Sequence, residues 1–227
     1  MSKKHPIVAV TGSSGAGTSN VKTAFEQIFL REGIMPAIIE GDSFHRYNRK
    51  EMDVAMEKAA SKGRFVTHFG PEGNLFDDLE ALFQEYSESG TGNHRHYIHN
   101  KIEAAQHNSP PGTLTPWKPL PNDTTVLFYE GLHGGLVTDK HNIVQYVDLL
   151  IGVVPIINLE WMQKIHRDKA TRGYSSEDAT NMILERMHDY AHYIVPQFSS
   201  TDINFQRVPT VDTSNPFAVD RIPSDDE

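Results

Sequence analysis

The most constraining feature of this 227-residue sequence is the stretch from Ile7 to Ser19, which reads IVAVTGSSGAGTS. Its first residues form a short apolar run rich in β-branched side chains, as in a buried strand. Three glycines then leave the turn with few Cβ atoms, and a helical pattern follows. A strand, a glycine-rich turn and a helix are the context of a phosphate-binding loop, because loop N–H groups and the positive helix end face one anion.

The loop departs from the pattern G-x-x-x-x-G-K-[ST] at one position. Gly12 and Gly17 fit, and Ser19 fits the hydroxyl that binds magnesium, but position 18 is threonine instead of lysine. The missing cation must come from elsewhere in the chain, or nucleotide binding is weak. An ordinary βα turn with glycines for tightness is the alternative. The predicted nucleotide-binding residues are Gly12, Ser13, Ser14, Gly15, Ala16, Gly17, Thr18 and Ser19.

Composition narrows the class of protein. The sequence contains no cysteine, which removes a disulfide framework and a thiolate nucleophile and fits a reducing cytoplasm. A net charge of −9 argues against nucleic acid as the main partner, since phosphate backbones need a basic surface. No apolar stretch approaches the roughly 20 residues that cross a bilayer, and no signal peptide is expected, so we expect no membrane partner.

Strand and helix patterns alternate along the chain, which predicts an α/β fold with a doubly wound, mainly parallel sheet and helices on both faces. The predicted strands are 7–10, 36–40, 124–129, 147–154 and 208–211, and the predicted helices are 21–31, 51–62, 75–86, 158–170 and 176–193. Between about residues 90 and 122 the pattern dissolves into a loop rich in glycine and proline, and a loop of this length is functional or disordered. We expect a single domain over residues 1–227.

Acidic residues follow two predicted strands, at the sheet edge where ligands bind in open α/β folds. Asp42 is followed by His45, Arg46 and Arg49, which suits a base beside an anionic substrate. The alternative is a helix N-cap with solvated cations behind it. Glu130 resembles a magnesium-binding acid, although an isolated acid at a strand end is about equally common.

A basic cluster, KIHRDKATRG, is the best source of the missing cation. Lys164 and Arg167 share a helix face, Arg172 follows, and Asp168 lies between them. Such cations can also simply complement the dipole of a helix C-terminus. Tyr97 and His99 lie in the irregular segment, where flexible surface aromatics are the alternative to a binding role. His188 and His192 have metal-ligand spacing, but no further ligand completes a set, so a surface or core role is favoured.

Taken together, six motifs resemble the bacterial-type phosphoribulokinase family. They are TGSSGAGTS, EGDSFHRYNR, RHYIHN, LFYEGLHGG, GVVPIINLEWMQKIHRDKATRGY and PQFSSTDINFQRVPTVDTSNPF, and they span nearly the whole chain. The resemblance implies a P-loop kinase-like fold and an enzyme that uses ATP and Mg²⁺ to convert ribulose 5-phosphate to ribulose 1,5-bisphosphate. A loop without lysine is a feature of this family. The plant-type branch is regulated through cysteines, so the bacterial branch fits better.

The resemblance also implies roles for particular residues. Asp42 matches the catalytic base, Asp168 a second essential acid, and Glu130, with Ser19, the magnesium site. Lys164 and Arg167 match active-site cations. The sugar-phosphate pocket is implied at His45, Arg49, Tyr97, His99 and Arg172. Arg186 matches a position linked to activation by NADH.

Relative to this family, the sequence lacks a C-terminal segment, so sheet completeness, the homo-oligomeric assembly of the family and the effector response are open. Two alternatives are a related small-molecule kinase, such as a uridine-kinase-like enzyme, and a catalytically impaired nucleotide-binding module. The cation-rich segment GDSFHRYNR favours a phosphorylated substrate over a nucleoside.

Overall fold

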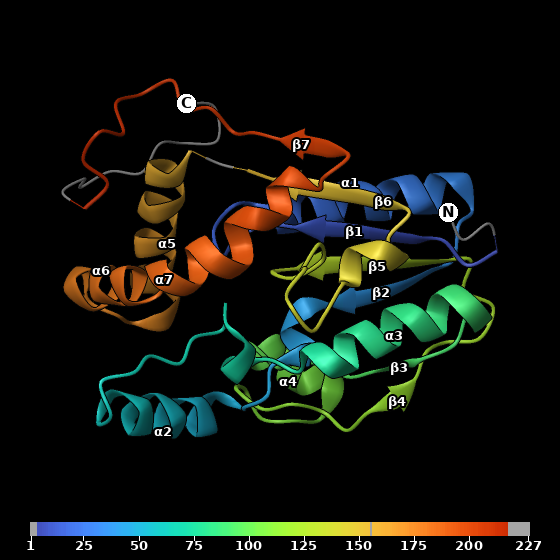
Figure 1. The fold of residues 1–227 in the computed structure, drawn as a ribbon, viewed down its shortest axis with the longest axis horizontal. Coiled ribbons are helices and arrows are strands. Elements are labelled where there is room, and N and C mark those ends of the chain that lie inside the picture. The colour runs from blue at the N-terminus through green and yellow to red at the C-terminus, as the bar shows by residue number, and fades with distance from the viewer. Residues whose placement is uncertain (1–3, 155, 218–227) are drawn as a thin grey trace.

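The computed structural model describes residues 4–154 and 156–217, and at residues 171 and 172 it describes the backbone alone. Its centre is a five-stranded parallel sheet in the order β2–β5–β1–β6–β7 (Figure 1). The strands are β1 Ile7–Thr11, β2 Pro36–Glu40, β5 Val126–Gly131, β6 Leu149–Val153 and β7 Ile203–Phe205. Because all five strands run the same way, their carboxyl ends meet at one edge, where a ligand site is expected.

The helices connect these strands as the sequence pattern predicts. They are α1 Thr18–Glu32, α2 Arg49–Ala60, α3 Phe76–Ser89, α4 Lys101–His107, α5 Ile157–Arg172, α6 Ser176–Glu185 and α7 Met187–Asp189, and the 3₁₀ turns include η1 Gly41–Phe44, η3 Ile143–Tyr146 and η5 Val195–Ser199. Within the described part of the chain, none of these helices combines the length and apolarity needed to span a bilayer.

Two separate cores cover the two faces of the sheet, because neighbouring residues of a strand point to opposite faces. On one face, Ala9 and Leu127 pack with residues of α3, including Leu79 and Phe83. On the other face, strand residues such as Phe128 pack against α1. The doubly wound sheet with helices on both faces is thereby confirmed.

The remaining helices lie beyond the carboxyl ends of the strands. In Figure 1, α5, α6 and α7 form one group past the end of the sheet, and α2 lies below them. Gly173 ends α5 in a left-handed conformation, and a capping box formed by Ser175 and Asp178 begins α6. The expected single helix over 176–193 is interrupted at Arg186 and ends in a π-helical turn, η4 Tyr190–Ile194.

Two expectations about irregular segments need revision. The strand expected at 208–211 is wrong: β6 pairs with Ile203–Phe205 instead, and Pro209 removes a backbone donor from the later stretch. The segment 90–122 contains short regular elements, namely α4 and an antiparallel pair of β3 Asn93–His94 with β4 Lys118–Pro119. Asn100 caps α4 by accepting from two backbone N–H groups, so this segment has its own local order.

Candidate active site

The phosphate loop lies between β1 and α1 and is packed against α5. Gly15 and Gly17 have φ of 107° and 97°, which a residue with a Cβ rarely adopts, so the sequence needs glycine at both. A Cβ at Gly15 would lie 3.3 Å from the Glu160 carbonyl oxygen and 3.5 Å from the Cβ of Lys164. The loop is therefore placed directly over the α5 residues that the sequence predicts to assist it.

The strand ends beside this loop approach one another unusually closely. A Cβ at Gly41 would lie 2.4 Å from the Tyr129 hydroxyl, and one at Gly131 would lie 2.7 Å from the Gly41 Cα. Two adjacent glycines thus allow β2 and β5 to deliver Asp42 and Glu130 to one small region.

Glu130 lies near the end of β5, beside the start of α1. Burial raises the pKa of its carboxyl, and a hydrogen bond from the Thr18 side chain opposes this shift. The threonine in place of the loop lysine therefore contacts the strand-end acid. Lys22, one turn along α1, donates to Glu40 at 2.5 Å and lies near Glu130. Sequence reasoning missed Lys22 and Glu40, although helical spacing from Thr18 and the last position of β2 would have pointed to them.

These side chains suit a magnesium ion. Mg²⁺ is usually held in proteins by one or two carboxylates together with phosphate oxygens and water. Ser19 lies in the first turn of α1 and Glu130 is the penultimate residue of β5, so a hydroxyl and a carboxylate border the loop. Among the described residues, no group of three or more His, Cys, Asp or Glu is arranged to hold a metal alone. The residues fit an ion that nucleotide phosphates help to bind.

The α5 cations and Asp168 form a buried ionic cluster. Lys164 Nζ donates to Asp168 Oδ2 at 2.5 Å, and Arg167 donates twice to Oδ1 at 3.1 and 3.0 Å. Asp168 is fully buried and Lys164 is 3% exposed. Burial is the main reason that the pKa of Lys164 is lowered to about 8, and the Arg186 charge adds to the shift.

Arg167 also reaches the phosphate loop. Its Nη2 donates to the Ser14 hydroxyl at 3.1 Å, so the structure places an α5 cation on the loop that lacks lysine. A further arginine, Arg207 after β7, lies 3.7 Å from the Cβ position of Gly17 and donates to Gln163 at 3.3 Å. Sequence reasoning missed Arg207, because the strand that precedes it, Ile203–Phe205, was expected at 208–211 instead.

Asp42 lies on η1, between two histidines. Nε2 of His45 is 3.4 Å from Asp42 Oδ1, and Nε2 of His99 is 3.4 Å from Oδ2. Tyr97 packs against both imidazoles, with ring centroids 5.6 Å from His45 and 4.9 Å from His99. Burial lowers the pKa of His45, while the Asp42 carboxylate opposes the shift. Of the residues predicted for the sugar-phosphate pocket, His45, Tyr97 and His99 are brought together around Asp42.

Two arginines contact the backbone around Asp42 and its histidine neighbours. Arg49 donates to the His99 carbonyl oxygen at 3.4 Å, which places the predicted arginine at the pocket wall. Arg95, the first residue of the motif RHYIHN, donates to the carbonyl oxygens of Ser43 and His45 at 2.7 Å each. Its guanidinium lies 4.5 Å from the Trp117 ring centroid. Segment 90–122 therefore holds the backbone that carries Asp42.

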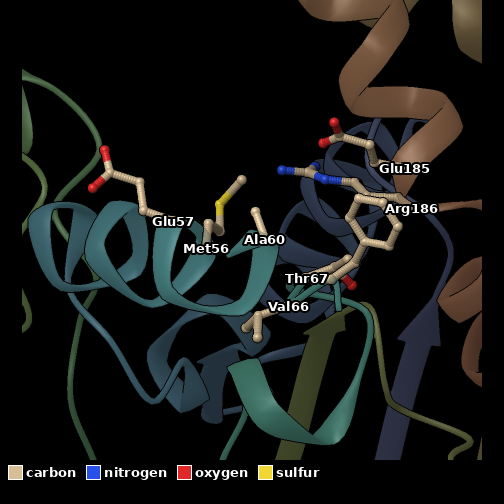
Figure 2. A pocket seen from close by; sticks show the side chains of 8 residues that line it. Met56, Glu57, Ala60, Val66, Thr67, Glu185 and Arg186 are labelled. Atoms are coloured by element: carbon tan, nitrogen blue, oxygen red, sulfur yellow. The ribbon is translucent and has the colours of Figure 1, made fainter. Parts of the chain in front are cut away.

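Arg186 lines a separate cavity of about 210 Å³ between α2 and the end of α6. Figure 2 shows Arg186 and Glu185 above the cavity, with Met56 and Ala60 of α2 opposite. The Arg186 charge also acts on Lys164 and His45. The side chain of Arg172 lies outside the described residues.

The histidine pair on the C-terminal helical segment lies away from these groups. The rings of His188 and His192 stack with centroids 4.2 Å apart, and Nδ1 of His192 bonds the His188 carbonyl oxygen at 2.7 Å. Both residues are exposed. They occupy a helix surface.

The chain that carries this site matches a known family. The sequence profile of the phosphoribulokinase / uridine kinase family matches residues 7–214. The chain belongs to this family. Phosphoribulokinase of Nitrobacter vulgaris is 61% identical over 228 residues, covering 100% of this chain and 79% of the relative. The chromosomal phosphoribulokinase of Cupriavidus necator is also 61% identical, covering 100% and 78%.

A solved structure agrees with this assignment. Phosphoribulokinase from Rhodobacter spheroides superposes with a TM-score of 0.88 and 53% identity, covering 98% of this chain and 77% of that one. The family relationship identifies a kinase, and the resemblance inferred from the six motifs is confirmed. The phosphoribulokinase / uridine kinase family thus accommodates a phosphate loop without lysine, and here α5 supplies cations to it.

Proposed function

We propose that this chain transfers the γ-phosphoryl group of ATP to the 1-hydroxyl of ribulose 5-phosphate, a step of the Calvin cycle. The product is ribulose 1,5-bisphosphate. The observation that carries the proposal is the identity of about 60% over the whole chain with proteins named phosphoribulokinase. The geometry supports it, because cations, acids and histidines surround the place where a phosphate loop meets the sheet edge.

The phosphate loop binds ATP in this proposal. Phosphoryl transfer is mainly a matter of positioning and charge stabilisation, so the loop N–H groups and the α5 cations carry much of the task. Lys164 and Arg167 take the place of the loop lysine beside the transferring group. Ser19 and Glu130 hold Mg²⁺, which neutralises developing phosphate charge when it is bound.

Asp42 is the proposed general base. The 1-hydroxyl of the sugar attacks the γ-phosphorus, its proton passes to the Asp42 carboxylate, and the bond to the ADP oxygen breaks. His45 and His99 flank both carboxylate oxygens and so fix the orientation of the base. Asp168 is a less suitable base, since Lys164 and Arg167 occupy both of its oxygens, and we assign it to positioning those cations.

The remaining pocket residues bind the sugar phosphate. Tyr97 packs against both histidines, and Arg49 stands at the wall formed by His99. We assign the 5-phosphate to Arg49 and Arg172, because guanidinium groups bind phosphate through paired N–H donors. His45, Tyr97 and His99 then contact the sugar hydroxyls.

Regulation and setting are part of the same proposal. We assign Arg186 to the response to an NADH effector, which is supported by its influence on the charges of Lys164 and His45. We further propose a cytoplasmic enzyme that forms homo-oligomers, as its family resemblance implies.

The test is single-turnover phosphorylation with labelled ATP, offered ribulose 5-phosphate, other sugar phosphates and nucleosides in turn, with and without Mg²⁺. We expect rapid, Mg²⁺-dependent labelling of ribulose 5-phosphate. Preference for uridine would establish the uridine-kinase-like alternative. ATP binding without transfer to any acceptor would establish a catalytically impaired module.

A further inference from the structure

Helix α5 carries three buried charged side chains at four-residue spacing, and the mechanism above uses two of them. Glu160, Lys164 and Asp168 lie at i, i+4 and i+8, and they are 3%, 3% and 0% exposed. Side chains at this spacing share one face of a helix. Lys164 and Asp168 are paired with each other, which leaves the buried Glu160 without an assigned role.

Glu160 lies between the phosphate loop and the π-helical turn η4. The Tyr190 hydroxyl donates to Glu160 Oε2 at 3.4 Å. On the loop side, the hydroxyl of Ser13, which is 2% exposed, lies near the Glu160 carboxyl and favours its ionised form, but its Oγ makes no hydrogen bond of good geometry among the described residues. The Glu160 carbonyl oxygen is also in close contact with the Gly15 position, 3.3 Å from its Cβ site. Glu160 thus meets the loop through its carbonyl oxygen at Gly15 and the π turn through its carboxyl at Tyr190, with Ser13 buried beside it.

The π turn is what brings Tyr190 to this position. A π-helical turn inserts one residue into a helix and changes which side chains face a neighbour, and such turns are frequent at functional sites. Tyr190 and Ile194 of this turn are buried against Phe69. The turn is therefore firmly packed, and a contact with it can hold Glu160.

We propose that Glu160 is a positioning residue that ties the π turn at Tyr190 to the phosphate loop at Ser13, and so sets the loop and Lys164 for phosphoryl transfer. This role rests on the proposed kinase function. In the complex with ATP the carboxyl is protonated, because an anion buried under the loop would repel the nucleotide phosphates.

The charges around Glu160 support this assignment. Burial raises the pKa of Glu160 to about 7, and Ser13, Tyr190 and Lys164 oppose the shift. The charge of Lys164 in turn depends on Asp168, Arg167 and Arg186. With this pKa, Glu160 is only partly protonated at neutral pH in the free protein. It therefore takes up a fraction of a proton when ATP binds. ATP affinity should consequently fall as the pH rises through 7, by at most tenfold per pH unit.

The experiment compares ATP binding by the wild type, Glu160→Gln and Tyr190→Phe, using calorimetry from pH 6 to 8.5. Glutamine retains the shape and neutrality of the protonated acid. We expect Glu160→Gln to match the wild type at pH 6, and to bind ATP about three- to tenfold more tightly than the wild type at pH 8. Tyr190→Phe removes a hydrogen bond that lowers the pKa of Glu160. The pH at which ATP affinity begins to fall should therefore be higher in this variant than in the wild type.

Matched controls separate this role from a loss of packing. Glu177→Gln, at the exposed first turn of α6, and Tyr193→Phe, in the same π turn, should follow the wild-type pH dependence. Glu160→Leu should lower kcat about tenfold with little change in KM for the sugar phosphate, and Glu160→Gln should restore kcat.

Identical pH dependence in the wild type and Glu160→Gln would overturn the proposal, as would an unshifted inflection in Tyr190→Phe. Circular dichroism identifies a variant that fails to fold. If either Glu160→Gln or Tyr190→Phe fails to fold, the other variant tests the proposal. ATP binding needs no sugar phosphate. Failure of the wild type to phosphorylate ribulose 5-phosphate would therefore count against the proposed function and leave the binding result standing.

Discussion

The two sides of the active site are held in place in different ways. On the α5 side, Lys164 and Asp168 lie one turn apart on a single helix and are almost fully buried. On the η1 side, Asp42 and His99 come from segments more than fifty residues apart, and the Asp42 side chain is 37% exposed. The α5 side is a pre-formed ionic unit, whereas the η1 side depends on tertiary contacts that align a base with its acceptor.

Asp42→Asn tests the η1 side most directly. An amide cannot accept the proton of the attacking hydroxyl, so we expect kcat to fall on the order of 10²–10⁴-fold. Both substrates should still bind, because the loop and the α5 cations are unchanged. Rapid-quench kinetics with separate binding measurements check this. Near-normal turnover would show that Asp42 is not the general base. Asp168, on the α5 side, would then be the candidate.

Lys164→Met tests the α5 side. The variant removes a cation beside the transferring phosphoryl group but keeps the length of the side chain, so we expect the transfer rate to fall about 10²–10³-fold. Binding of Mg²⁺–ATP should be largely retained. Lys169→Met, at an exposed position of the same helix, is the control and should be near normal. Weaker binding of Mg²⁺–ATP with an unchanged transfer rate would show that Lys164 only contacts the bound nucleotide in the ground state.

Arg95→Lys tests whether the η1 side depends on hydrogen bonds from a residue far away in the sequence. Lysine cannot reproduce two planar N–H donors to the carbonyl oxygens of Ser43 and His45. We expect kcat/KM for the sugar phosphate to fall about tenfold, since a lost hydrogen bond from a charged group is worth about 1.5 kcal/mol or more. ATP affinity should not change. A parallel loss of ATP affinity would show that the two sides are coupled.

His133, behind the η1 side, offers a test through stability. Its Nε2 bonds the Phe69 carbonyl oxygen at 2.9 Å, and burial lowers the pKa of His133 to about 4. The unfolded state, with a pKa near 6.5, binds the proton first, so the free energy of unfolding falls as the pH drops from about 6.5 to 4.

The loss attributable to His133 is about 3 kcal/mol at pH 4. Urea unfolding of the wild type and His133→Gln across this pH range measures it. The glutamine variant should lose less stability in acid. Equal loss of stability in acid in both proteins would mean that groups other than His133 account for the loss.

The contrast between the two sides also explains what could be predicted from sequence. The alternation of patterns predicted the sheet and its main helices, and the three-residue spacing of Lys164 and Arg167, with Asp168 between the cations, was enough to predict the cluster on α5. The support that Arg95 gives to η1 could not be inferred, because it crosses fifty residues of chain. Tyr190 was likewise hidden, since a helical pattern gives no sign of a π turn.

Strand pairing was the least predictable part of the fold. The valines at 208 and 211 resemble a strand, yet the edge position beside β6 is taken by Ile203–Phe205. Both segments are short, and the hydrophobic pattern alone does not decide between them. Lys22 and Glu40 were missed for a different reason: local patterns pointed to each residue separately, but their pairing joins α1 to the end of β2 and is visible only in the fold.

The contact between Gly41 and Gly131 limits how this enzyme can be re-engineered. Any side chain at either position would collide with the opposing backbone or the Tyr129 hydroxyl. Libraries that vary these two positions should return glycine at both, whatever acceptor the selection rewards. A change of substrate must therefore be sought in the side chains around the site, with the backbone at these two positions left as it is.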